Sequence, residues 1–189
     1  MNSMPWLWRA ENGSAVTVTS NKFTMPESNV IVSATFKEVV VTGETTATIN
    51  FGYAKGSTAI NSTSVTGVDS QSNSWTVTTV MQETSFTQNA SYSQIGSKSK
   101  PATSITFTTT LPDTVTKVTA LSINMGGFSG TAGTVTLKVG ESTVGTGTLS
   151  GGDDITVSST TEANGRTITI SVTGISKGVK VYGISATYN

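Results

Sequence analysis

A two-residue alternation of β-branched or aromatic residues with threonine and serine runs through most of this chain. It is clear in residues 103–107 (TSITF) and 167–172 (TITISV). Successive side chains of a β-strand point to opposite faces, so this alternation predicts strands with one buried and one solvated face. Threonine and valine are also stiff at Cβ and suit a pleated surface. The pattern therefore predicts an all-β protein.

The alternating segments are short and closely spaced, with glycines between them where chain reversals need positive φ. The expected strands after the N-terminal part are residues 45–51, 74–80, 84–88, 103–109, 115–124, 133–139, 142–149, 154–159, 166–172 and 179–188. Asn164-Gly165 predicts a type I′ hairpin with Val157 and Ile168 on its two arms. Many short strands without helical segments predict a β-sandwich or a barrel.

The N-terminal part carries two expected strands of its own. Residues 15–20 and 30–36 alternate, and turn residues 25–29 lie between them, so we expect a β-hairpin. We divide the chain into residues 1–38, a hairpin appendage, and residues 39–189, a β-sandwich domain. Whether the hairpin docks on the sandwich stays open.

Charge and apolar runs argue against a nucleic acid partner and a membrane span. Charged residues make up 12% of the chain, and 11 Lys and Arg balance 11 Asp and Glu without any basic cluster. A nucleic acid partner would require several clustered cations, so we expect none. No apolar run approaches the roughly 20 residues of a membrane span.

The first ten residues lack the basic and apolar regions of a secretory signal. If the protein is exported, its signal has been removed, lies on a longer parent chain or was never used. We expect an extracellular or cell-surface location for a fragment of a larger protein, or else a virion location, and whether the chain is a fragment stays open.

Catalysis has few candidate groups here. The chain contains no histidine and no cysteine, which removes imidazole bases, thiolate nucleophiles and structural zinc sites. The acidic residues are scattered, and the adjacent pair Asp153-Asp154 follows two glycines, where turn chemistry explains it. We expect neither an enzyme nor a cofactor.

A metal site is weakly suggested at residues 69–73 (DSQSN), where oxygen-bearing side chains alternate. Calcium takes 6–8 oxygen ligands including several carboxylates, and this segment supplies one. Asp69 and Asn73 are therefore weak candidates, and a solvated loop leading into the Trp75 strand is the favoured interpretation. Trp75 alternates with Val77, which places both side chains in the core.

A ligand-binding loop is expected between the strands of Phe86 and Ile105. Sugar-binding surfaces combine tyrosine or tryptophan rings with amide and carboxylate hydrogen-bonding groups. The candidate ligand-binding residues are Gln88, Asn89, Tyr92, Gln94 and Tyr53. Phe128 is a further possible neighbour, and the alternative is an ordinary loop anchored by a buried tyrosine.

Two family resemblances follow from particular strings of residues. The first is carried by Trp8, Asn12-Gly13, residues 16–19, 23–26 (FTMP), 29–30 and 34–36. This part resembles the C-terminal half of the InlB B-type repeat, the Listeria-Bacteroides repeat family of bacterial surface proteins. The resemblance implies a partial repeat at the N-terminus.

The second resemblance is carried by residues 47–51, 74–77, 91–96, 102–107, 118–123, 133–140, 167–172 and 181–188. These segments are similar to a jelly-roll-like domain of surface and secreted proteins of gut Bacteroidetes and Firmicutes, where it follows B-type repeats. The resemblance implies a jelly-roll-like β-sandwich related to carbohydrate-binding sandwiches. That family has no agreed binding residues, so none is assigned on this basis.

Together these features favour a non-catalytic extracellular binding or adhesion module, with a polysaccharide or cell-surface glycan as its partner. The alternative is a structural or assembly subunit, such as a stalk spacer or a phage virion decoration protein. The sequence leaves the ligand and the oligomeric state open.

Overall fold

The computed structural model describes residues 7–10, 30–33 and 43–189. The chain divides into two units, Met1–Val41 and Thr42–Asn189. In the first unit, β1 (Leu7–Ala10) pairs antiparallel with β2 (Val30–Ser33). The expected strand 15–20, the turn 25–29 and most residues of the first resemblance lie outside the described residues.

Every regular element of residues 43–189 is a β-strand, which confirms the all-β prediction. The strands are β3 (Thr45–Asn50), β4 (Ser64–Val68), β5 (Ser74–Met81), β6 (Phe86–Gln88), β7 (Ser93–Ile95), β8 (Ala102–Thr110), β9 (Lys117–Gly127), β10 (Thr131–Val139), β11 (Ser142–Gly151), β12 (Asp154–Ser159), β13 (Ala163–Asn164), β14 (Thr167–Thr173) and β15 (Val179–Tyr188). Strands β4, β7 and β13 were not expected from the sequence. Across the residues the structure describes, no helix is long and apolar enough to span a membrane.

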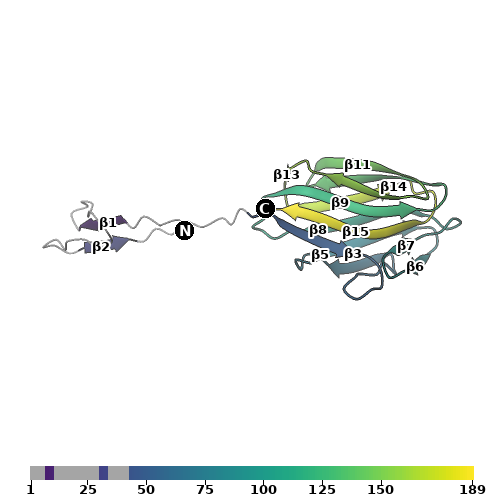
Figure 1. Ribbon diagram of the computed structural model, residues 1–189, viewed down its shortest axis with the longest axis horizontal. Helices are drawn as coiled ribbons and strands as arrows, with labels where there is room; N and C mark the ends of the chain where they lie inside the picture. The colour runs from purple at the N-terminus through teal and green to yellow at the C-terminus, as the bar shows by residue number, and fades with distance from the viewer. Residues whose placement is uncertain (1–6, 11–29, 34–42) are drawn as a thin grey trace. The chain divides into compact units, whose positions relative to one another are not determined.

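The strands form two antiparallel sheets packed face to face (Figure 1). One sheet has the order β11-β10-β14-β8-β5-β4. The other has the order β12-β9-β15-β7-β6, with β3 also paired to β15 and β13 also paired to β9. The predicted β-sandwich is therefore confirmed.

Eight of these strands form a nested set of pairs that defines a jelly roll. The first strand pairs with the last (β3 with β15), β8 with β14, β9 with β12, and β10 with β11. Successive pairs alternate between the two sheets, as in a hairpin rolled up on itself. Strands β4 to β7 are inserted between β3 and β8, where two extend each sheet.

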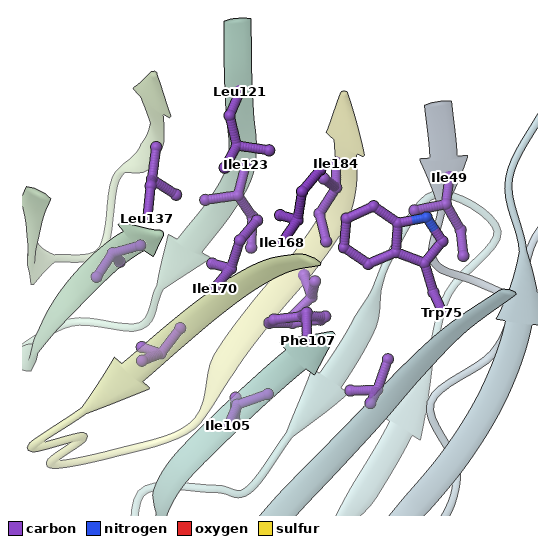
Figure 2. Close-up of a cluster of buried hydrophobic side chains, with 14 of the residues drawn as sticks. Ile49, Trp75, Ile105, Phe107, Leu121, Ile123, Leu137, Ile168, Ile170 and Ile184 are labelled. Atoms are coloured by element: carbon purple, nitrogen blue, oxygen red, sulfur yellow. The ribbon is translucent and has the colours of Figure 1, made fainter. Parts of the chain in front are cut away.

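The core lies between the sheets and takes every second side chain of the facing strands (Figure 2). Strand β5 shows the alternation most simply, with Trp75 and Val77 at most 1% exposed between exposed neighbours. Trp75 thus faces the core, as predicted. The ring of Phe51, which directly follows β3, and the ring of Phe107, in β8 of the other sheet, lie with centroids 5.5 Å apart. Aromatic packing thus joins the two sides of the core.

The outer face of the six-stranded sheet is lined mostly by hydroxyl groups, with the exposed side chains of Val68 and Val80 among them. Thr66, Thr76, Thr108 and Thr169 stand opposite one another across four neighbouring strands. Lys138, opposite Thr169, is the one charged residue in the six strands of this sheet. Cross-strand threonine pairs stabilise a sheet through packing of their methyl groups and through hydrogen bonding.

The hairpin prediction at Asn164-Gly165 was wrong. Strand β12 pairs with β9 in one sheet, and β14 pairs with β8 and β10 in the other. The dipeptide therefore carries the chain from one sheet to the other, and Val157 and Ile168 lie in opposite sheets. The residue types of a turn indicate where the chain reverses direction. They do not indicate whether the two flanking strands pair in one sheet or lie in two sheets packed face to face, because both arrangements bury alternate side chains.

Truncation of Phe107 tests the core. Phe107→Ala removes a fully buried ring that contacts Phe51, so we expect a loss of about 3–5 kcal/mol in the free energy of unfolding, measured by urea denaturation. Val80→Ala, on neighbouring strand β5 with a side chain 59% exposed, is the matched control and should change stability by less than about 0.5 kcal/mol. Equal losses in both variants would contradict this description of the core.

Candidate functional site

The candidate site is built on a β-bulge in the last strand. Strand β15 pairs with β9 along one edge, and the register shifts between Val181 and Gly183, which leaves Tyr182 as the extra residue. On its other edge β15 pairs first with β7, up to Val181, and then with β3, from Gly183 onward. Bulges bend a strand and re-aim its side chains. Tyr182 is partly exposed, whereas the preceding Val181 is fully buried.

Gly183 allows strand β3 to lie close beside the bulge. A Cβ atom at Gly183 would come within 2.8 Å of the Ile49 carbonyl oxygen and 3.1 Å of Asn50 Oδ1. Phe51 N donates a 2.8 Å hydrogen bond to the Tyr182 carbonyl oxygen at the same place. A larger side chain at position 183 would push β3 away, so the glycine fixes the geometry of the site.

A shallow depression of about 260 Å³ lies over these strands. Its lining comes from β3, β9, β15 and the loop before β7, and it carries hydroxyl, amide and phenol groups. These include Thr48, Asn50, Ser91, Ser122, Asn124 and Tyr182. None of the lining residues is charged, so the surface presents neutral hydrogen-bonding groups.

A compact group of side chains borders the depression, and we call Tyr92, Phe128, Asp154, Lys180 and Tyr182 the tyrosine–lysine cluster. The Tyr92 and Tyr182 rings meet edge to face, with centroids 5.4 Å apart and planes at 63°. Lys180 Nζ lies 5.8 Å from the Tyr92 ring centroid and 5.2 Å from that of Phe128. These distances are within the range of cation–π attraction.

Asp154 joins the cluster by reaching across strand β9. It stands opposite Gly126 in the register of β12 and β9, and a Cβ atom at Gly126 would clash with Asp154 Oδ1. Its Oδ2 accepts a 2.8 Å hydrogen bond from the Tyr182 hydroxyl, and its Oδ1 lies 3.7 Å from Lys180 Nζ. Burial and this hydrogen bond to the carboxylate raise the pKa of Tyr182 to about 12.

The loop after β9 positions Phe128 in the cluster. Phe128 N donates a 2.8 Å hydrogen bond to Thr131 Oγ1, and the same hydroxyl donates to the Gly178 carbonyl oxygen. Lys177 Nζ donates to the Ser129 carbonyl oxygen. The loop of Phe128 is therefore tied to the loop that precedes β15.

Of the five ligand-binding candidates from the sequence, Tyr92 lies in the cluster, next to the depression. Gln94, in β7, donates a 3.1 Å hydrogen bond from Nε2 to the Gly96 carbonyl oxygen. Gln88 ends strand β6 opposite Ser93 and is partly buried. The structure thus brings one of these three side chains to the tyrosine–lysine cluster.

Asn89 and Tyr53 lie in two loops that are hydrogen-bonded to each other. Asn89 Oδ1 accepts a hydrogen bond from Ser91 N, which shapes the turn that carries Ser91 to the depression. Tyr53 N donates to the Asn89 carbonyl oxygen, and the Tyr53 side chain is 63% exposed. Asn89 therefore acts on the turn, while Tyr53 presents a free aromatic surface.

Five residues of the site were not expected from the sequence: Tyr182, Lys180, Asn50, Asn124 and Asp154. A signal for the first was present, because Tyr182-Gly183 places a glycine inside an alternating strand, where it indicates a bulge or a close backbone approach. Asp154 was interpreted as a turn residue, and its reach across Gly126 depends on which strands are neighbours. That pairing is not visible in the sequence.

The weak metal candidates Asp69 and Asn73 form a structural network. Asp69 Oδ1 accepts hydrogen bonds from the backbone N–H groups of Gln71 and Asn73, and Oδ2 accepts one of 2.9 Å from Trp75 Nε1. Asn73 Nδ2 donates to both Asp69 oxygens and to the Tyr188 hydroxyl. Asp69 and Asn73 are 6% and 7% exposed, so at these two residues the expected solvated loop was wrong.

The carboxylate of Asp69 thus has its oxygens engaged by protein donors, and the network ties the β4–β5 loop to the last strand. Within the described ranges, no group of three or more acidic, histidine or cysteine residues could hold a metal ion.

Comparisons with known proteins give weak structural likenesses. No protein-family model matches the chain, and no curated protein matches it. Among solved structures, the chain is similar to CsCBM6-3 from Clostridium stercorarium in complex with cellobiose, at 12% identity and a TM-score of 0.31, over 65% of this chain and 79% of that one.

Two further structures are similar to a comparable degree. One is the Stig cyclase Fisc from Fischerella sp. TAU in complex with (3Z)-3-(1-methyl-2-pyrrolidinylidene)-3H-indole, at 15% identity and a TM-score of 0.34, over 62% of this chain and 76% of that one. The other is the Arthrobacter globiformis T6 isomalto-dextranase complexed with panose, at 11% identity and a TM-score of 0.31, over 96% of this chain and 29% of that one. Likenesses at this level do not assign a function.

Removal of the Asp69 carboxylate tests the structural role of that network. Asp69→Ala leaves the Trp75 indole N–H and the Asn73 backbone N–H without their acceptor, so we expect a loss of about 2–4 kcal/mol in the free energy of unfolding, measured by thermal or urea denaturation. Glu141→Ala, in an exposed turn, is the control and should be neutral. A rise in Tm of the wild type with added Ca²⁺, abolished in Asp69→Ala, would instead support a metal site.

Titration of Tyr182 tests the contact with Asp154. In Asp154→Ala we expect the pKa of Tyr182 to fall from about 12 towards the ordinary value near 10, because the phenolate loses a neighbouring negative charge. NMR of ¹³C-labelled tyrosine, recorded against pH, resolves the four tyrosines of the chain. In the wild type, the stabilisation from neutral Tyr182 is present below pH 10 and is lost as the pH rises towards 12. An unchanged Tyr182 pKa in Asp154→Ala, or an equal fall in Asp153→Ala, would contradict the assignment.

Proposed function

We propose that this chain is a non-catalytic module that binds a glycan on the outer face of strands β3, β15 and β9. The observation that carries the proposal is the position of the Tyr92 and Tyr182 rings beside an uncharged, hydrogen-bonding depression. Glycan sites need this combination, because a sugar ring has apolar C–H faces and a rim of hydroxyl groups.

The two tyrosines supply the aromatic part of the site. Both are partly exposed, and their planes are inclined by 63°, so they present surfaces in two directions. One ring can stack against a sugar face while the other forms a side wall. The contacts to Lys180 and Asp154 hold the pair in place before a ligand arrives, which lowers the entropy cost of binding.

The depression supplies the polar part. The amides of Asn50 and Asn124 each offer donors and an acceptor, and the hydroxyls of Thr48, Ser122 and Ser185 offer both. Sugar hydroxyl groups also donate and accept, so neighbouring groups of this kind can satisfy them in either direction. These residues are on strands, which fixes their spacing better than a loop would.

The non-catalytic part of the proposal is supported by the side chains available. The chain has no histidine or cysteine to act as base or nucleophile. Asp154, the carboxylate at the site, is engaged by the Tyr182 hydroxyl and Lys180. Hydrolysis of a glycosidic bond uses a pair of carboxyl groups across the bond, and the depression itself is lined by none.

An extracellular location, on a cell surface or a virion, belongs to the same proposal. It is supported by the resemblance of the N-terminal residues to a bacterial surface repeat and by the hydroxyl-rich, weakly charged composition.

Substitution of the tyrosines tests the proposal. We expect Tyr92→Ala and Tyr182→Ala each to weaken retention on an immobilised polysaccharide by about tenfold, since an aromatic stacking contact contributes about 1–2 kcal/mol. Thr76→Ala, on the outer face of the opposite sheet, is the matched surface control and should bind as the wild type does. Binding would first be located on a broad glycan array, with Tm measured for every variant.

Equal retention of all three variants would exclude this face as the binding site. Ordered oligomers by light scattering, without affinity for any glycan on the array, would favour an assembly subunit over a binding module.

A further inference from the structure

The chemistry of the depression also restricts the class of glycan. Resting on the glycan-binding function proposed above, we propose that the site accepts uncharged glycans and excludes those carrying carboxylate or sulfate groups, with Asp154 as the discriminating residue. Three features of the described residues lead to this: the lining of the depression, the state of Lys180, and the direction of the Tyr182 hydroxyl.

The lining contains no cation that could pair with a ligand anion. Its polar side chains are hydroxyls, amides and one phenol, from residues such as Asn50, Asn124 and Ser122. Moving an anionic group from water to a surface without a counter-charge is costly, because hydrogen bonds from neutral donors replace only part of its hydration. An uncharged sugar has no such penalty.

Lys180, the cation of the neighbouring cluster, is already occupied. Its Nζ lies 3.7 Å from Asp154 Oδ1 and within 6 Å of the ring centroids of Tyr92 and Phe128, and its side chain is 20% exposed. A ligand anion would have to compete with the Asp154 carboxylate for this ammonium group. The carboxylate is tethered beside Lys180, so the ligand is at a disadvantage.

The hydroxyl of Tyr182 presents an oxygen acceptor. Its proton is donated to Asp154 Oδ2 at 2.8 Å, and the phenol is protonated throughout the neutral range. The remaining lone pairs of the phenol oxygen can accept a hydrogen bond from a sugar hydroxyl. A ligand carboxylate or sulfate has hydrogen-bond acceptors and no donor, so it cannot form a hydrogen bond to the phenol oxygen. It would also be repelled by the negative charge of the nearby Asp154 carboxylate.

The extent of the depression fits a short section of a chain. It runs across β9, β15 and β3, which are neighbours in the sheet, so its width is two strand spacings, or about 10 Å. This is about the length of two sugar rings. A charged substituent on either ring would therefore fall against the lining or against Asp154.

Matched pairs of polysaccharides test the charge selection directly. The probes are dextran with dextran sulfate, hydroxyethylcellulose with carboxymethylcellulose, and methyl-esterified with de-esterified homogalacturonan, used in affinity electrophoresis at physiological ionic strength. In every pair that binds, we expect the neutral member to bind at least about tenfold more tightly than the anionic member. An anionic member that binds equally or more tightly would overturn the charge selection and leave the binding function standing. No binding to any of the six would count against the binding function itself.

Asp154→Asn tests the discriminating residue. The amide oxygen can still accept the Tyr182 hydrogen bond, but Lys180 loses its counter-charge, so we expect the ratio of anionic to neutral affinity to rise about fivefold. Because Asp154 also holds Tyr182, the readout is this ratio and not the affinity for either member alone, and the control Asp153→Asn should leave the ratio unchanged. If Asp154→Asn leaves the ratio of the two affinities unchanged, Asp154 is not the discriminating residue.

Discussion

Strand β15 is the element on which both the sheet and the site depend. It is hydrogen-bonded along both edges, to β9 on one side and to β7 and then β3 on the other. The change of partner from β7 to β3 on one edge coincides with the bulge at Tyr182 in the pairing with β9 on the other edge. At the bulge, Tyr182 departs from the alternation of buried and exposed side chains along β15. The absence of a Cβ atom at Gly183 allows β3 to lie close to β15 at this point. The bulge residue Tyr182 and the following Gly183 thus both line the depression.

The fold class was predicted from the alternation of apolar and polar residues. This alternation shows which side chains of a strand are buried, but it does not show which strands pair with each other. Trp75 and Val77 were correctly assigned to the core, because a strand buried on one face imposes period two on its residues. Asn164-Gly165 was misassigned because hairpin propensity is local, whereas β12 and β14 belong to different sheets. Strand β7 was missed because three residues, Ser93–Ile95, are too few to show a period. Strand pairing arises from packing between distant segments, which a single sequence does not display.

The site was foreseen only in part, and for a related reason. Tyr92 stood out because it is an aromatic residue in a polar segment. Its partner Tyr182 is distant in the chain and joins it only because β7 pairs with β15. Asp69 shows the converse, since its pattern of alternating oxygen atoms resembled a metal loop, yet its carboxylate binds Trp75 Nε1 and backbone N–H groups. The sequence shows which hydrogen-bonding groups a polar residue has, whereas the fold determines which groups it contacts.

The hydroxyl-lined outer face of the six-stranded sheet bears on how such molecules behave when crowded together. Its strands contain Lys138 as their single charged residue, and the chain as a whole carries equal numbers of acidic and basic groups. The molecule therefore has little long-range electric field, and two copies approaching through these faces would meet almost no charge repulsion. Its hydration comes from uncharged hydroxyl groups, which hold water equally well at low and high ionic strength. Contacts made through this face would therefore depend little on the salt concentration of the surroundings.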